Sequence, residues 1–264
     1  MHRFRPYSAV QIEPAYALRY AWFTWLSDGH DVTWPNGLSA RIAPLWEFDG
    51  IRLLNAHRNQ ELVVVNFSAK PSVCPILLAQ RAKGRLTYQL RCEGVRHEFS
   101  RKFAVRSIGE NTNRDVEIYI ARQVERERFV DPRFSEMLSR FRLQWDDVDL
   151  SLPWAAKRSR YWYDLHLVLV TEERFRISTE SMLEAIRDRL ISLRVFNGCR
   201  FKSLQLMPDH MHLLLRANFE HSPAMVAQWI QNETATAIGL RLWKDTYYVG
   251  TTGEYSMNAI RHEW

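Results

Sequence analysis

The chain has 264 residues, enough for one large domain or two smaller ones, and its 46% hydrophobic and 25% charged residues are typical of a globular protein. No apolar run approaches the ~20 residues that a membrane span needs, and the polar start MHRFRPYSAV is not typical of a signal peptide, so we expect a cytoplasmic protein. The formal net charge of +6 permits a polyanionic partner, and three cysteines without C-x-x-C spacing exclude a disulfide framework or a zinc knuckle.

The first half of the chain alternates strand-like and helix-like segments. The apolar residues 18–26 predict a strand, residues 48–71 supply further strands, and residues 72–91 predict a helix. A strand, a glycine turn and a second helix follow over residues 102–127, and residues 131–145 add an amphipathic helix.

Residues 146–160, which contain Pro153 and a change of charge, form the natural joint between two halves. The second half predicts, in order, a strand at 161–171, a helix from Thr179 to Leu193, one strand over 202–217, a helix over 222–243 and, over 247–264, a strand, a glycine turn and a helix that opens at Ser256.

The closing units of the two halves correspond. Gly109 matches Gly253, each is followed by a glutamate, and a short strand rich in β-branched and aromatic residues precedes each glycine. We interpret the chain as a tandem duplication of two diverged copies, residues 1–150 and residues 151–264.

A basic segment lies between residues 81 and 106. Tyr88, Phe99 and Phe103 are interleaved with its positive charges, a pattern that suits phosphate contacts and base stacking. A solvated basic face is an equally compatible alternative. The side chains expected to bind nucleic acid are Arg81, Lys83, Arg85, Arg101, Lys102 and Arg106.

Two histidines, His210 and His212, are separated by one apolar residue in a strand-like stretch. Because successive side chains of a strand point to opposite faces, both imidazoles lie on one face, as two metal ligands require. Such a pair in isolation is more often two core or surface histidines than a metal site, so its interpretation depends on what accompanies it.

The ordered set of motifs resembles the single-tyrosine HUH transposases of small bacterial insertion sequences and the REP-associated tyrosine transposases. In the second half the resemblance lies in YDLHLVLVTEERF, MPDHMHLLL and YYVGTTGEYS, and in the first half it lies in SAKPSVCPILLAQRAKGRL and FAVRSIGENTNRDVEIYIARQ. These motifs are specific as an ordered set and weak one at a time.

The resemblance implies an α+β fold of two ferredoxin-like sandwich domains in tandem, which form an intramolecular pseudo-dimer. It also implies that two histidines hold Mg²⁺ or Mn²⁺ beside a tyrosine on a C-terminal helix. This tyrosine attacks single-stranded DNA and forms a 5′-phosphotyrosine, and a glutamine four residues further on completes the metal site. In the family the tyrosine helix is exchanged between two subunits.

The family positions, carried over to this chain, are divided between its halves. His210 and His212 match the metal pair in the second half, but Glu263 stands where the tyrosine of that half belongs. In the first half Tyr119 matches the tyrosine, and Gln123 follows it at the spacing that places both on one helix face.

At the corresponding ligand positions of the first half stand Leu62 and Val64. These apolar side chains bind no metal. If the helices are exchanged between halves, as the resemblance implies, the tyrosine helix of the first half joins the histidine pair of the second half in one complete site. Glu263 then meets the apolar pair in an abandoned site, where we expect it to be inert.

The function expected from this site is metal-dependent nicking and strand transfer of single-stranded DNA next to hairpins, by a transposase or a domesticated derivative. The chain would act as a pseudo-dimeric monomer or as two paired chains. The alternative is a catalytically silent protein that binds hairpin DNA or RNA or regulates a partner. Tyr119 alone also fits a buried helix tyrosine, and His166 a structural or DNA-facing role.

Overall fold

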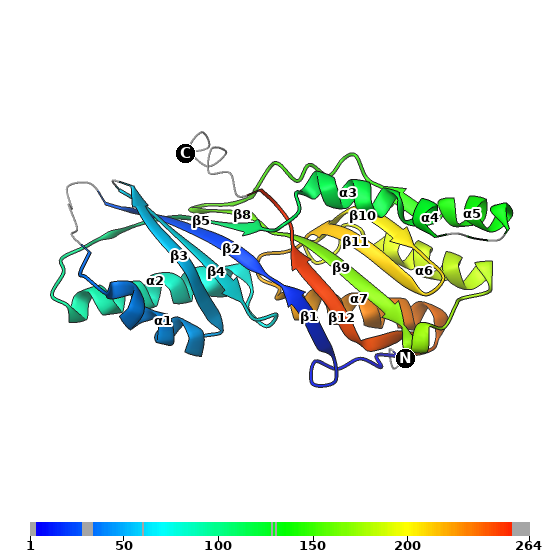
Figure 1. Ribbon diagram of the computed structural model, residues 1–264, viewed down its shortest axis with the longest axis horizontal. Coiled ribbons are helices and arrows are strands. Elements are labelled where there is room, and N and C mark those ends of the chain that lie inside the picture. Colours follow the sequence, from blue (N-terminus) through cyan, green and yellow to red (C-terminus); the bar gives the residue numbers. More distant parts are fainter. Residues whose placement is uncertain (1–3, 28–33, 60, 128, 130, 255–264) are drawn as a thin grey trace.

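The computed structural model describes residues 4–27, 34–59, 61–127, 129 and 131–254. Two six-stranded sheets lie beside each other along the long axis of the molecule (Figure 1). The first sheet contains, in spatial order, β3 (Ile51–Asn59), β4 (Leu62–Ala69), β2 (Arg19–Leu26), β5 (Phe99–Ile108), β8 (Ser159–Trp162) and β7 (Trp154–Ala156). The second sheet contains β1 (Glu13–Ala17), β12 (Trp243–Thr251), β9 (Asp164–Thr171), β11 (His210–Arg216), β10 (Arg200–Leu206) and β6 (Arg142–Gln144).

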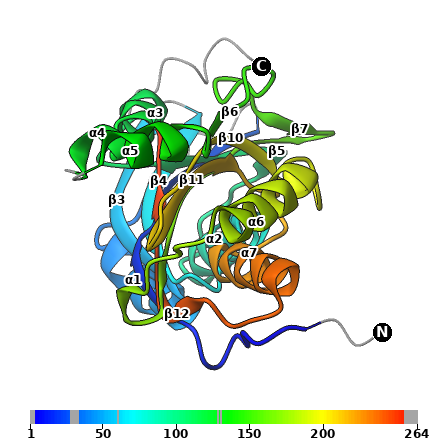
Figure 2. The same cartoon turned by 90° about the vertical axis from the view of Figure 1, so that its right-hand side faces the viewer.

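Helices cover both sheets, so the fold is of the α+β class that the sequence predicts. The helices of the first sheet are α1 (Leu38–Phe48) and α2 (Pro75–Cys92). The second sheet carries α6 (Glu180–Leu193) and α7 (Pro223–Ile238) on one face, and α3 (Asn113–Ala121), α4 (Gln123–Arg126) and α5 (Pro132–Ser139) on the other (Figure 2), while the short helix η1 (Glu172–Arg174) follows β9. Within the described residues, no helix is long and apolar enough to cross a membrane.

The two sheets share one topology. The chain order β2-α1-β3-β4-α2-β5 in the first half recurs as β9-α6-β10-β11-α7-β12 in the second half. The spatial order also recurs, because the first strand of each set lies between the third and the fourth strands of that set. All pairings inside both sets are antiparallel.

Each half also contributes one strand that pairs in parallel with a strand in the sheet of the other half. A single residue separates β1 from β2, yet β1 pairs in parallel with β12 of the other sheet. A single residue likewise separates β8 from β9, yet β8 pairs in parallel with β5. The chain changes sheets at Leu18 and at Tyr163, which are both buried. The boundary predicted at residue 150 therefore does not separate the sheets, which exchange strands across it.

The glycine turns that end β5 and β12 touch each other. The Gly109 amide donates a hydrogen bond of 3.1 Å to the Gly253 carbonyl. A Cβ atom at Gly109 would collide with the Thr251 carbonyl, and one at Gly253, where φ is +131°, would lie 2.6 Å from the Ser107 carbonyl. Both turns require glycine because the backbones of the two halves cross at this point.

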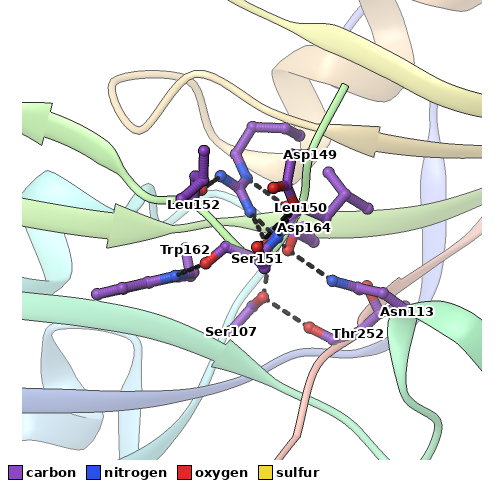
Figure 3. Close-up of polar contacts among 10 residues, drawn as sticks. Ser107, Asn113, Asp149, Leu150, Ser151, Leu152, Trp162, Asp164 and Thr252 are labelled. Atoms are coloured by element: carbon purple, nitrogen blue, oxygen red, sulfur yellow. Dashed lines mark hydrogen bonds and ion pairs between the residues drawn. The ribbon is translucent and has the colours of Figure 1, made fainter. Parts of the chain in front are cut away.

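A buried ion pair lies beside this crossing (Figure 3). The Arg216 guanidinium at the end of β11 donates to both carboxylate oxygens of Asp164 at the start of β9, and the two side chains are 5% and 3% exposed. The remaining donors reach the carbonyls of Leu150 and Leu152, and the Asn113 amide donates to Asp164 at 3.0 Å. The pair thereby joins the second sheet, the linker and the first residue of α3.

Several expected elements differ from those observed. Residues 202–217 were expected as one strand, which is wrong, because the chain turns at residues 207–209 and forms the hairpin of β10 and β11, with the Met207 amide 2.8 Å from the His210 carbonyl. Residues 161–171 belong to two strands in different sheets, and the helix expected over 131–145 ends at Ser139. The sequence does not predict α1, whose internal Pro44 is unusual in a helix.

Asp164→Ala should leave the buried Arg216 guanidinium without its carboxylate and lower the free energy of unfolding by about 3–5 kcal/mol. Urea unfolding followed by circular dichroism measures this loss. The matched control is Asp147→Ala, which removes the exposed partner of Arg194 and should cost at most about 1 kcal/mol. Equal losses in the two variants would contradict a central role for the buried pair.

Candidate functional site

Three imidazoles gather on the face of the second sheet that α3 covers. Met211 and Leu213 of β11 point into the large core with α6 and α7, whereas Leu214 packs against α3. The alternation of the strand therefore sends His210 and His212 to the α3 face, where their ring centroids lie 5.1 Å apart. His166 in β9 joins them, with its ring centroid 5.3 Å from that of His212.

Each histidine of the predicted metal pair is held through Nδ1. The Asp209 carboxylate lies 2.7 Å from His210 Nδ1, and His166 Nε2 lies 3.1 Å from His212 Nδ1. When Nδ1 carries the proton and donates it to such a partner, Nε2 keeps the lone pair that binds a metal. The residues around the pair thus suit coordination through the two Nε2 atoms.

Burial lowers the pKa of two of these imidazoles. It lowers the pKa of His212 to about 2, with smaller contributions from His166, His210 and the positive charge of Arg126. It also lowers the pKa of His166 to about 4. Both rings are neutral at neutral pH, which is the form that binds a metal or accepts a hydrogen bond.

Helix α3 brings Tyr119 to these histidines from the other half of the chain. A capping box between Thr112 and Asp115 starts the helix. Its apolar side, Val116 and Ile120, packs against Leu214 of the second sheet and against the linker. The Tyr119 ring lies edge-on to the imidazoles, with its centroid 5.2 Å from that of His212 and 6.0 Å from that of His166.

Gln123 begins α4 and is buried beside Tyr119. Its side-chain amide nitrogen donates to the Tyr119 carbonyl at 2.9 Å, which leaves the side-chain oxygen as the group that can accept or coordinate. Within the described part of the chain, no three His, Cys, Asp or Glu side chains form a metal cluster. The groups on this face that can coordinate a cation include the imidazole nitrogens and the Gln123 side-chain oxygen.

Arg126 is a site residue that the sequence patterns did not indicate. The exposed guanidinium lies over the Tyr119 ring, with its central carbon 4.6 Å from the ring centroid. Arg126 follows Tyr119 by seven residues, which is about two helical turns and places both side chains on one helix face. This spacing could have indicated Arg126 from the sequence. His166 was considered only as a structural or DNA-facing residue, and the structure brings it into contact with both Tyr119 and His212.

The first sheet has apolar residues at the positions of the histidine pair. Ala21 and His166 are each the third residue of their strand. When Ala21 is aligned with His166, the pairing of the neighbouring strands aligns Leu62 with His210 and Val64 with His212. They belong to an apolar cluster, as the sequence predicts, and Glu263 lies outside the described residues.

The predicted basic side chains do not gather at the imidazoles, because they lie on α2 and β5 of the first sheet (Figure 1). Arg85 pairs with Asp49, Arg81 donates to the Asp49 carbonyl, and Lys83 donates to the Ser100 carbonyl. Arg101 and Lys102 are exposed, and Arg106 lies over the Trp162 ring. Three of the six charges thus make intramolecular contacts that fix α2.

Because its pKa is lowered to about 2, the His212 imidazole should stay neutral from about pH 8 to pH 5 in the metal-free protein. Two-dimensional ¹⁵N–¹H NMR of the histidine rings detects the protonation state directly. The His212→Gln variant assigns the resonance. A titration midpoint near the ordinary value of about 6.5 would contradict the burial that lowers this pKa.

Comparisons with known proteins match part of the chain. Residues 159–262 match the family model described as transposase IS200-like. The ISDra2 transposase TnpA of Deinococcus radiodurans is 24% identical over 125 residues, which cover 42% of this chain and 89% of that protein.

Two solved structures are also similar to part of the chain. A putative transposase from Deinococcus radiodurans gives a TM-score of 0.32 at 24% identity, over 37% of this chain and 85% of that one. A REP-associated tyrosine transposase bound to a REP hairpin gives a TM-score of 0.30 at 14% identity, over 38% of this chain and 61% of that one. The family match and the curated relative confirm the resemblance predicted from the sequence, and residues 159–262 are related to the IS200-like transposases.

Proposed function

We propose that the chain is a metal-dependent endonuclease and strand transferase of single-stranded DNA, a transposase or a domesticated derivative, which cuts near hairpins. One observation carries the proposal: the Tyr119 ring, from the first half, lies 5.2 Å from the His212 ring, from the second half. A tyrosine nucleophile beside a pair of imidazoles is the arrangement that the resemblance to transposases implies. We call Tyr119, Gln123, His210 and His212 the composite site.

The composite site has donors that fit a divalent cation such as Mg²⁺ or Mn²⁺. His210 and His212 would bind it through Nε2, and Gln123 through its side-chain oxygen. When bound, the cation polarises the scissile phosphate and neutralises the charge that develops on it. The three donors carry no charge, so they leave the positive charge of the cation undiminished.

Tyr119 supplies the covalent step. Its hydroxyl oxygen forms a bond to the phosphorus as the bond from phosphorus to the 3′-oxygen breaks. The Tyr119 hydroxyl loses its proton and the leaving 3′-oxygen takes one up, so one DNA strand ends in a free 3′-hydroxyl and the other stays attached as a 5′-phosphotyrosine. Because this ester keeps the energy of the phosphodiester, a 3′-hydroxyl can attack it and reseal a strand without ATP.

The repeated topology supports a tandem pseudo-dimer. Two copies, residues 1–150 and 151–264, would each lend a strand to the other, and the first copy would also lend a helix, as the positions of β1, β8 and α3 indicate. The equivalent position in the first sheet has only Leu62 and Val64. One chain would therefore cut one site, and reactions at two DNA ends would need two chains.

Tyr119→Phe should abolish the covalent adduct that forms with a single-stranded hairpin oligonucleotide and Mn²⁺, because the variant lacks the attacking oxygen. A denaturing gel with labelled DNA detects the adduct. The matched control is Tyr248→Phe, since the Tyr248 ring also lies 6.0 Å from His166 but comes from β12. An adduct that persists in Tyr119→Phe and disappears in Tyr248→Phe would refute the assignment of the nucleophile. Hairpin binding without an adduct in the wild-type chain would identify a silent DNA-binding protein instead.

The exposed Arg101 should bind the DNA backbone, whereas Arg85 is engaged by Asp49. Arg101→Gln should weaken hairpin binding and reduce the slope of log affinity against log salt by about 0.7 for each phosphate that is no longer neutralised. Arg85→Gln, with one charge fewer as well, should leave the slope unchanged. Fluorescence anisotropy over a salt series measures both, and the reverse ranking would place the DNA on α2.

A further inference from the structure

Arg126 presents an exposed positive charge directly at the proposed nucleophile. The central carbon of its guanidinium lies 4.6 Å from the Tyr119 ring centroid. The same ring lies edge-on to His212, with its centroid 5.2 Å from that of the imidazole. Arg126 therefore contacts the tyrosine that faces the histidine pair, although it is not itself one of the four residues of the composite site.

Among the residues that the structure describes, this guanidinium has no partner of opposite charge. Within the described residues, the arginines Arg85, Arg174 and Arg216 each pair with a carboxylate, whereas no ion pair joins Arg126 to one. Its neighbours Glu125 and Glu127 are exposed and form no ion pair with it in the same described part of the chain. A guanidinium that stacks on an aromatic ring keeps its in-plane N–H donors available for an anion.

A phosphodiester is the anion that this site would receive under the proposed function. The phosphate must approach the Tyr119 hydroxyl, and the guanidinium lies over the same ring, so its planar donors can reach the non-bridging oxygens. We infer that Arg126 is a catalytic residue of the composite site, which binds a non-bridging oxygen of the scissile phosphate and remains on it in the phosphotyrosine. This inference rests on the proposed function.

The role of Arg126 is electrostatic. While the bond from the Tyr119 oxygen to phosphorus forms and the bond to the 3′-oxygen breaks, negative charge grows on the non-bridging oxygens. The guanidinium supplies a delocalised positive charge and N–H donors, and it transfers no proton. Fixed donors at the place where charge develops stabilise the transition state more than the bound substrate.

Single-turnover adduct formation with hairpin DNA and Mn²⁺ tests the inference. Arg126→Gln should slow adduct formation by about 10²–10³-fold, while the affinity for the hairpin changes only a few-fold. Arg126→Lys should form the adduct at an intermediate rate, because lysine keeps the positive charge but lacks the planar, bidentate donors of a guanidinium. The matched control is Arg114→Gln, an exposed arginine in the first turn of α3, which should react at the wild-type rate. Wild-type rates in Arg126→Gln, or equal losses in the two glutamine variants, would overturn the inference.

A methylphosphonate at the scissile linkage identifies the oxygen that Arg126 binds, because it replaces a charged non-bridging oxygen by a methyl group. If Arg126 binds that oxygen, Arg126→Gln should cause little further loss on one methylphosphonate diastereomer. A full additional loss on both diastereomers would overturn the assignment. Failure of the wild-type chain to form any adduct would overturn the proposed function and this inference together, whereas a wild-type adduct with an unaffected Arg126→Gln overturns this inference alone.

Discussion

The buried ion pair of Asp164 and Arg216 organises the junction on which the composite site depends. An arginine removed from water requires a partner for each of its donors, and here these partners come from the start of β9 and from the linker carbonyls. Asn113 binds the same carboxylate, so the first residue of α3 is fixed to the second sheet. The position of Tyr119, two turns along that helix, follows from this attachment and from the apolar contacts of Val116 and Ile120.

The exchange of strands explains why residues from opposite halves meet. The chain changes sheets at Leu18 and at Tyr163, and the glycine turns after β5 and β12 cross at hydrogen-bonding distance. A helix that leaves the first turn is thereby directed onto the second sheet. The face it covers has imidazoles, whereas the corresponding face of the first sheet has an apolar cluster around Val64.

Much of this arrangement could be predicted from local patterns. Strand alternation placed His210 and His212 on one face, and the four-residue spacing placed Gln123 beside Tyr119. The sheet changes could not be predicted, because residues 161–171 are mostly apolar and read as one continuous strand-like stretch across Tyr163. The turn at Pro208 was hidden in the same way between two buried strands. The charge pattern identified Lys83 and Arg85 as basic residues, but it did not show that Lys83 donates to the Ser100 carbonyl and that Arg85 pairs with Asp49.

The central claim is that one cation site is built from both halves of the chain, next to Tyr119. Anomalous diffraction from crystals grown with Mn²⁺ tests it most directly, because the peak locates the ion without reference to activity. We predict one peak between Nε2 of His210, Nε2 of His212 and the side-chain oxygen of Gln123. A peak elsewhere, or none at this face while Mn²⁺ supports adduct formation in solution, would contradict it.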